Sequence, residues 1–137
     1  MEILERFDKI VYSNNKMTNT HSCQAIVVSC MDFRLRKHLR DWTTKTVRGG
    51  YDRLALTGGI KDLSFVLDQI ELSVKLHNTY NAYLINHEDC GAYGAESNYK
   101  RHKKDLLFAK KIIKQKFRKL KIYLLYLKLN GEFINVS

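Results

Sequence analysis

Residues 25–34 read AIVVSCMDFR, an apolar run that leads directly into side chains able to bind a metal or carry a proton. The first four residues are apolar and mostly β-branched, which predicts a strand buried in a parallel sheet. This run stops at Cys30. Residues 82–91, AYLINHEDCG, are built in the same way, because a second predicted strand ends just before His87 and Cys90. These two stretches determine the predicted fold.

Outward from these stretches, helical and strand patterns alternate along the chain. The patterns predict a short basic helix at 34–42, a strand at 53–56 in preference to 45–47, an amphipathic helix around 63–74, a basic helix at 100–120, a strand at 122–129, a hairpin turn at 130–131 and an edge strand at 133–136. Strands separated by helices predict βαβ units. The predicted fold class is therefore α/β, with a mostly parallel central sheet of about four strands, an antiparallel C-terminal edge strand and helices on both faces.

The length and composition fit one domain. The chain has 137 residues, of which 45% are hydrophobic, enough for a single core. We expect one domain over residues 1–137, with an N-terminal helical arm at 1–20, whose amphipathic helix spans 2–12, and a catalytic core at 25–137. No run of about 18 apolar residues is present, which predicts no membrane span. The acidic start without an apolar h-region indicates no secretory signal, so we expect a cytoplasmic protein.

The net charge of +10 is concentrated late in the chain. Residues 100–121 are rich in lysine and contain Asp105 as their single acid. Such a segment favours phosphates and anionic surfaces. The basic residues mostly lie off the apolar stripe of the predicted helix, however, so a solvated helix face is the better interpretation and nucleic-acid or membrane binding the alternative.

Cys30, His87 and Cys90 form a candidate metal site. If the two strands that precede them are neighbours, their carboxyl ends meet at one edge of the sheet, where functional groups collect. Two thiolates and one imidazole suit a tetrahedral zinc ion, and three protein ligands leave a fourth position open, as in catalytic sites. Cys23 would make the site structural as a fourth ligand, but it lies at the opposite end of its strand, so we expect it to be left over. An odd number of cysteines argues against disulfides.

Asp32 and Arg34 follow Cys30 at the same strand end. A carboxylate there can accept a hydrogen bond from water on zinc, and a bidentate arginine contact can hold it ionised and oriented. Glu88 and Asp89 lie between two of the ligands, and the sequence leaves open whether they tune the site or face solvent. The candidate proton shuttles, each better interpreted as a surface residue, are His38, His77 and His102.

At these residues the sequence resembles the β-class carbonic anhydrases. The C-x-D-x-R motif of that family corresponds to residues 30–34 (CMDFR), and the H-x-x-C-G motif to residues 87–91 (HEDCG). Residues 57–59 (TGG) are similar to the family's Ala-Gly-containing turn, and residues 122–136 are similar to its last two strands. The resemblance runs from about residue 25 to the C-terminus and indicates a compact, divergent member with a β-carbonic anhydrase-like fold.

The resemblance implies an activity and the residues that perform it. Cys30, His87 and Cys90 would bind one Zn²⁺ per chain, and Asp32 with Arg34 would form the catalytic dyad. The protein would be a lyase, a carbonate dehydratase, in which a zinc-bound hydroxide attacks carbon dioxide in a small apolar pocket and yields bicarbonate. Some family members have a closed, inactive state in which the aspartate replaces water, and Asp32 would then be a fourth ligand.

The resemblance also implies a homodimer or a dimer of dimers in which the helix at 2–12 packs on the partner. The sequence departs from the family pattern in three places. Ala55-Leu56 stand where Arg-Asn is usual, residues 43–51 form an unusual loop, and the stretch after Cys90 is short and basic. These departures leave the metal site intact but put the substrate in question. The alternatives are a zinc hydrolase acting on carbon disulfide or carbonyl sulfide, and a catalytically inactive, zinc-containing nucleic-acid-binding module.

Overall fold

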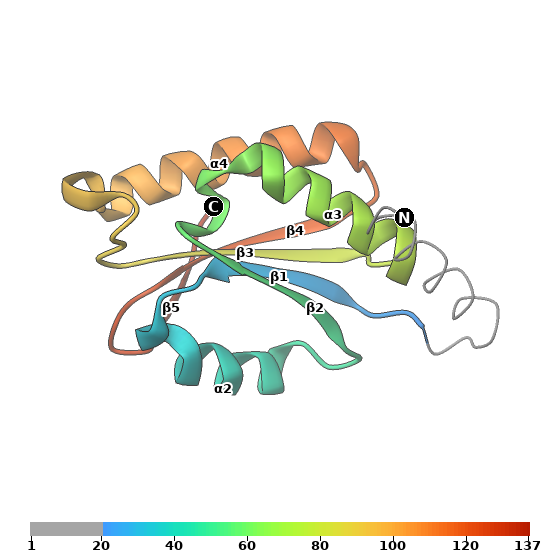
Figure 1. Cartoon of the computed structure of the whole chain (residues 1–137), viewed down its shortest axis with the longest axis horizontal. Coiled ribbons are helices and arrows are strands. Elements are labelled where there is room, and N and C mark those ends of the chain that lie inside the picture. The colour runs from blue at the N-terminus through green and yellow to red at the C-terminus, as the bar shows by residue number, and fades with distance from the viewer. Residues whose placement is uncertain (1–20) are drawn as a thin grey trace, which may run out of the picture.

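The computed structural model describes residues 21–137, which form one mixed sheet with helices on both faces (Figure 1). The strands are β1 (Ala25–Cys30), β2 (Tyr51–Leu56), β3 (Asn81–His87), β4 (Lys121–Leu127) and β5 (Phe133–Asn135). The helices are α2 (Arg36–Thr46), α3 (Leu63–His77) and α4 (Tyr99–Lys116), with short 3₁₀ turns η1 (Phe33–Leu35), η2 (Gly59–Lys61) and η3 (Gly94–Glu96). The predicted helical arm at 1–20, with its helix at 2–12, lies outside the described residues.

The sheet has the strand order β2-β1-β3-β4-β5. Strands β1 to β4 are parallel, and β5 runs antiparallel to β4 at the edge. The predicted fold class, a mostly parallel sheet with an antiparallel C-terminal edge strand, is confirmed. The predicted hairpin turn is also present, because the Gly131 amide donates to the Lys128 carbonyl over 2.9 Å.

Helices α3 and α4 cover one face of the sheet and α2 covers the other (Figure 1). The larger apolar core lies beneath α3 and α4, and its fully buried helical members are Val66, Ile70, Leu106, Ala109 and Ile113. These residues form the stripes that the sequence predicts for the two helices. A second apolar cluster between the sheet and α2 contains Cys30 and Cys90, so two of the candidate ligands belong to the core itself.

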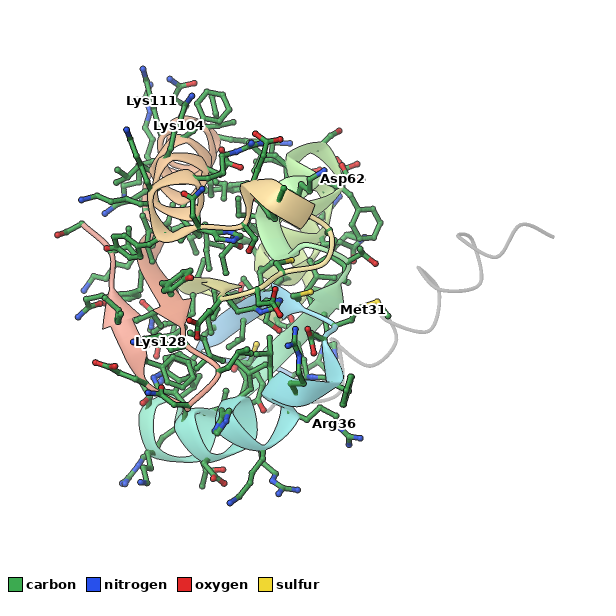
Figure 2. All side chains as sticks on the ribbon, turned by 90° about the vertical axis from the view of Figure 1, so that its left-hand side faces the viewer. Met31, Arg36, Asp62, Lys104, Lys111 and Lys128 are labelled. Carbon is green, nitrogen blue, oxygen red and sulfur yellow. The ribbon has the colours of Figure 1, made fainter. Side chains whose placement is uncertain are left out.

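Most lysines of α4 face solvent. Lys104 and Lys111 project from the helix away from the sheet (Figure 2), as expected for a solvated face. The helix ends at Lys116 rather than at 120, because the chain must turn there to bury Leu120 just before β4 begins. Within residues 21–137, no helix is both long enough and apolar enough to cross a membrane.

The loop predicted at 43–51 is shorter in the structure. Thr43 and Thr44 belong to the last turn of α2, where their hydroxyls donate to the carbonyl of Arg40 over 3.0 and 2.8 Å. Strand β2 begins at Tyr51, which confirms the predicted strand at 53–56 and leaves only residues 47–50 as the connection.

The strand order reverses between β1 and β3, since the chain proceeds from β1 to β2 on one side and from β3 to β4 on the other. In parallel sheets a crevice forms at the carboxyl ends of the strands that flank such a point. Cys30 is the last residue of β1 and His87 the last residue of β3. The fold therefore places both at the opening of the crevice.

Candidate metal centre

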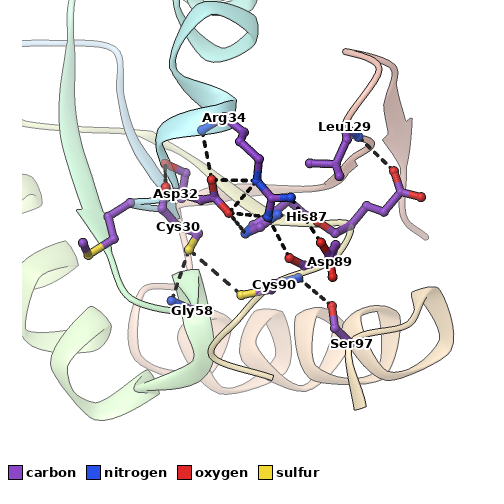
Figure 3. A network of polar contacts seen from close by, with 12 residues as sticks. Cys30, Asp32, Arg34, Gly58, His87, Asp89, Cys90, Ser97 and Leu129 are labelled. Carbon is purple, nitrogen blue, oxygen red and sulfur yellow. Dashed lines mark hydrogen bonds and ion pairs between the residues drawn. The ribbon is translucent and has the colours of Figure 1, made fainter. Parts of the chain in front are cut away.

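Cys30, His87 and Cys90 converge at the carboxyl ends of β1 and β3 (Figure 3). Their ligand atoms all lie within 4.8 Å of one another, and the two sulfur atoms are 4.0 Å apart. In a tetrahedral site with Zn–S bonds of about 2.3 Å, two sulfurs are separated by about 3.8 Å. All three side chains are buried. The separation and burial of the sulfurs thus suit a zinc ion.

The hydrogen bonding of the His87 ring indicates a position for a metal ion. Its Nδ1 lies 2.7 Å from the carbonyl oxygen of Glu88, and because only an N–H can bond to a carbonyl, the proton belongs on Nδ1. Nε2 is then a bare lone pair, and within the described residues it is buried without a hydrogen-bond partner. Such an atom is costly unless something binds it. Histidines that ligate metals are held in this way by a bond from the other ring nitrogen, so the residues present fit a metal ion.

The turn predicted at 57–59 contacts the site at Cys30. The Gly58 amide donates to the Cys30 sulfur over 3.4 Å. Gly58 and Gly59 have φ angles of +81° and +62°, and a Cβ on Gly59 would lie 2.7 Å from Oδ1 of Asn86. Only glycine fits this approach.

The two thiols differ in acidity. Burial acts to raise the pKa of Cys30, but the neighbouring His87 ring and the hydrogen bond from the Gly58 amide outweigh it and lower the pKa to about 7. Burial raises the pKa of Cys90, and the neighbouring Cys30 sulfur adds to the rise. A cation between them would favour both thiolates, since metal ligation deprotonates a thiol.

Asp32 and Arg34 form the predicted bidentate pair (Figure 3). Arg34 Nη2 lies 2.6 Å from Asp32 Oδ2, and Arg34 Nε lies 3.1 Å from Oδ1. The side-chain hydrogen bonds from Arg34 lower the pKa of Asp32 to about 2. Hydrogen bonds to Asp32 and then to Asp89 raise the pKa of Arg34. The carboxylate is therefore ionised at neutral pH, and its Oδ2 lies 4.0 Å from Nε2 of His87.

Arg34 also contacts the loop that follows β3, which the sequence did not indicate. Its Nη1 lies 3.1 Å from Asp89 Oδ2, and its Nη2 donates to the Asp89 carbonyl over 3.0 Å. Glu88 faces the other way and accepts a hydrogen bond from the Leu129 amide over 2.9 Å. Asp89 thus ties the two ligand-bearing loops together through Arg34, and Glu88 fastens the second loop to the terminal hairpin.

A buried polar network lies behind Cys90. The Cys90 amide donates to Ser97 Oγ over 2.8 Å, and Ser97 Oγ lies 3.0 Å from Nε2 of His102. Nδ1 of His102 lies 2.9 Å from the Asn86 amide nitrogen, which can only donate, so Nε2 of His102 carries the proton. Asn86 Nδ2 also donates to the hydroxyl of Tyr93 over 3.3 Å. The network fixes the loop that carries Cys90.

The expectation that His102 is a surface residue was wrong, because its side chain is fully buried. Burial, and then the neighbouring His87 ring, lower the pKa of His102 to about 4. The sequence did hold a signal, since His102 precedes Leu106 by four residues and lies on the same apolar stripe. His38 packs near the hairpin glycine Gly131, and His77 pairs with Asp52 at the opposite end of the sheet.

A groove of about 980 Å³ opens beside Cys30 and Asp32, between α2 and strands β1 and β2. The cationic residues that line it are Arg36, Lys37, Arg40 and Arg53. Two apolar side chains at its opening, Met31 and Phe33, are 63% and 81% exposed. The groove is therefore wider and more basic than the small apolar pocket that the resemblance implies.

The departure at Ala55-Leu56 lies in the last part of β2, where Leu56 pairs in register with Cys30. The Leu56 side chain packs against the core beneath α3 and α4. Leu56 is therefore on the opposite face from the groove, and its part of the departure alters the core side of the strand.

Comparison with known proteins gives a consistent result. Residues 20–137 match the protein family described as "Putative carbonic anhydrase". A protein of Rickettsia bellii described as uncharacterized is 28% identical over 147 residues, covering 90% of this chain and 87% of that protein.

Solved structures of carbonic anhydrases have the same fold. The carbonic anhydrase of Streptococcus mutans aligns with a TM-score of 0.64 at 18% identity, covering 100% of this chain and 99% of that chain. A tetrameric β-carbonic anhydrase of Sordaria macrospora aligns with a TM-score of 0.53 at 15% identity, covering 97% and 98%. The architecture of the chain is thus the β-carbonic anhydrase fold.

Proposed function

The chain belongs to the family described as "Putative carbonic anhydrase", and from that premise we propose that it is a zinc lyase that interconverts carbon dioxide and bicarbonate. Cys30, His87 and Cys90 hold one zinc ion in this proposal. The observation that carries it is the lone pair of His87 Nε2, which is buried, oriented by the bond at Nδ1 and directed at two thiols. Zinc supplies a nucleophile at neutral pH by lowering the pKa of bound water to about 7.

Asp32 and Arg34 orient the nucleophile. Asp32 is the hydrogen-bond acceptor beside His87, and its low pKa keeps it ready to accept throughout the neutral range. Arg34 engages both oxygens of Asp32, which restrains the carboxylate from moving onto the metal. We assign this arrangement to the open alternative for Asp32, in which a position on zinc is left for the reaction. The contact of Arg34 with Asp89 keeps the guanidinium in place.

The basic groove suits the anionic partner in the reaction. Four cationic side chains line it, and such a cluster raises the local concentration of bicarbonate. Groove and metal centre meet at Cys30 and Asp32, so an anion drawn into the groove reaches the site without crossing the core.

A homodimer or dimer of dimers is part of the proposal. Met31 and Phe33 expose large apolar surfaces at the opening of the groove, and residues of this kind are buried at protein interfaces. The related enzymes of Sordaria macrospora are tetrameric. Sedimentation analysis of the full chain tests this point, and Phe33→Ser is expected to increase the monomer fraction.

Stopped-flow hydration of carbon dioxide by protein of measured zinc content is the deciding experiment. We expect activity between pH 6 and 9, roughly the range in which zinc-bound water ionises, and its loss in Cys30→Ser. Protein with zinc bound at Cys30, His87 and Cys90 but without hydration activity would rule out the lyase. Turnover of carbon disulfide or carbonyl sulfide would then identify the alternative hydrolase. Salt-sensitive binding of nucleic acid by a zinc-loaded but inactive protein would identify the binding module instead.

A further inference from the structure

A second group of metal-binding side chains lies at the amino ends of the strands, opposite the first centre. Ligand atoms of Cys23, Asp52 and His77 all lie within 4.8 Å of one another. Cys23 precedes β1, Asp52 is the second residue of β2, and His77 is the last residue of α3. In Figure 1 these are the beginning of the blue and green strands and the far end of the green helix, away from the crevice.

Backbone hydrogen bonds hold the three elements together. The Cys23 amide donates to the His77 carbonyl over 3.0 Å, and the neighbouring Gln24 amide donates to the Gly50 carbonyl over 3.1 Å. The cluster is therefore anchored by the same bonds that start the sheet. Donor atoms fixed in this way lose little freedom when an ion binds.

Hydrogen bonds to Asp52 and His21 fix the His77 ring. Its Nδ1 lies 2.7 Å from Oδ2 of Asp52, and Ser73 Oγ donates to the same oxygen over 2.6 Å. The ring nitrogen and the carboxylate face each other, so a cation can replace the proton between them. The second oxygen of Asp52 can serve a cation directly.

His21 contacts the other nitrogen of the His77 ring. Its Nε2 lies 3.2 Å from Nε2 of His77, and the two rings are nearly perpendicular. This hydrogen bond occupies the ring nitrogen that does not face Asp52, so His21 orients the His77 ring from outside the cluster.

The cluster is only partly satisfied by protein contacts and is open to solvent. The Cys23 sulfur has two weak contacts of 3.5 Å, to the Ala25 carbonyl and the Thr79 hydroxyl. The side chains of His77 and Asp52 are 27% and 31% exposed, so an ion can reach them. A thiol, an imidazole and a carboxylate together form a donor set typical of zinc.

We propose that Cys23, Asp52 and His77 bind a second divalent ion of the zinc class. The ion ties the segment before β1 to β2 and to the end of α3, and so fastens the amino edge of the sheet. Because the donors come from separate elements, the ion binds only the folded chain and raises its thermal stability. The partial exposure makes this site weaker than the buried centre, and it takes no part in the proposed hydration reaction.

Metal titration of the full chain tests the proposal. We expect the wild type to bind two equivalents of Zn²⁺ in competition with a chromophoric chelator, the second more weakly. Cys23→Ser and Asp52→Asn should each lower the affinity of the weaker equivalent, by about 10–100-fold. Asp68→Asn, which removes the same charge from an exposed position of α3, is the matched control and should keep both equivalents. In Cys30→Ser the weaker equivalent should persist, which separates this site from the catalytic proposal.

Two results would overturn the second site. One is a wild type that binds a single equivalent and whose melting temperature does not rise with zinc beyond that point. The other is a second equivalent that Cys23→Ser and Asp52→Asn both leave unchanged. The melting temperature of the wild type needs no variant, so a variant that folds poorly does not prevent a decision. Co²⁺ provides an independent check, since thiolate-to-metal absorption from a second equivalent should disappear in Cys23→Ser.

Discussion

The two ends of the parallel sheet carry similar donor atoms in very different surroundings. At the carboxyl end, Cys30, His87 and Cys90 are buried and belong to the apolar core or touch it. At the amino end, Cys23 and His77 are half-buried and border solvent. Among residues 21–137, burial leaves His87 Nε2 of the first cluster without a hydrogen-bond partner, whereas the second cluster satisfies most of its polar atoms through Asp52, Ser73 and Thr79.

This difference indicates two different roles. In a buried cluster, electrostatic interactions are stronger than in water because the local dielectric constant is low. Catalysis by a cation depends on such strong interactions. A half-exposed cluster shares its ion with water, and its main effect is to hold chain segments together. The same donors can thus serve chemistry at one end of a sheet and stability at the other.

The largest expected difference is in zinc affinity. Cys90→Ser should weaken the buried centre by more than about 100-fold, beyond the loss typical of an outer-shell partner, because water cannot replace a buried thiolate. Cys23→Ser should weaken the amino-end site by a smaller factor, since solvent can fill the vacated position. Chelator competition on each variant measures both. Equal losses at the two ends would show that burial does not distinguish them.

Burial at the carboxyl end should also make stability depend on pH. The pKa of His102 falls from 6.5 to about 4 on folding, so between these values the unfolded chain binds one proton that the folded chain does not. The free energy of unfolding then falls by about 1.4 kcal/mol for each unit that pH decreases in this window, about 3 kcal/mol in all. Above pH 6.5 this contribution is constant.

Urea denaturation of metal-free protein at pH 7, 5.5 and 4.5 measures the effect. The free energy of unfolding of His102→Gln should fall less on acidification than that of the wild type. At pH 7 the variant should be less stable, because Asn86 and Ser97 lose a hydrogen-bond partner. His38→Gln, on the α2 side of the sheet, is the control. Parallel pH profiles for the wild type and His102→Gln would contradict the burial argument.

The elements around the first centre could largely be predicted from the sequence. The apolar runs before Cys30 and His87 predict strands, and the order of strands and helices predicts a parallel sheet in which those ends can meet. Each motif directly follows its strand, so the positions of the candidate ligands follow from the fold class. The pairing of Asp32 with Arg34 follows from their spacing of two residues at a strand end.

The contacts of Asp89 and of Cys23 depend on tertiary packing, which the spacing of residues in the sequence does not encode. Asp89 reaches Arg34 because it adopts a positive φ of 56° in a turn whose geometry the sequence leaves open. Cys23 was expected to be left over, yet it lies beside Asp52 and His77, which come from separate elements and form no motif. Only the register of β1 against β2 and the end point of α3 bring them together.

The next expected effect is on turnover. Arg34→Leu removes the contacts that hold Asp32 and Asp89, so kcat/KM for carbon dioxide hydration should fall by about 10–100-fold. Zinc content should be retained, because Arg34 is not a ligand. Arg118→Leu removes the same charge from an exposed residue after α4 and should leave turnover unchanged. Unchanged turnover in Arg34→Leu would remove the dyad from the mechanism.

The smallest expected effects come from two serines that support the two clusters. Ser97 accepts from the Cys90 amide at the carboxyl end, and Ser73 donates to Asp52 at the amino end. Replacing either with alanine removes one hydrogen bond, worth about 1 kcal/mol, and should weaken zinc binding a few-fold at that end alone. Titration of both variants with the same chelator gives the two affinities side by side. Ser97 and Ser73 lie at opposite ends of the sheet, so each replacement should affect only the nearer site. A variant that weakens both sites would show that the two clusters are coupled through the strands. The catalytic end and the structural end could then no longer be treated as independent.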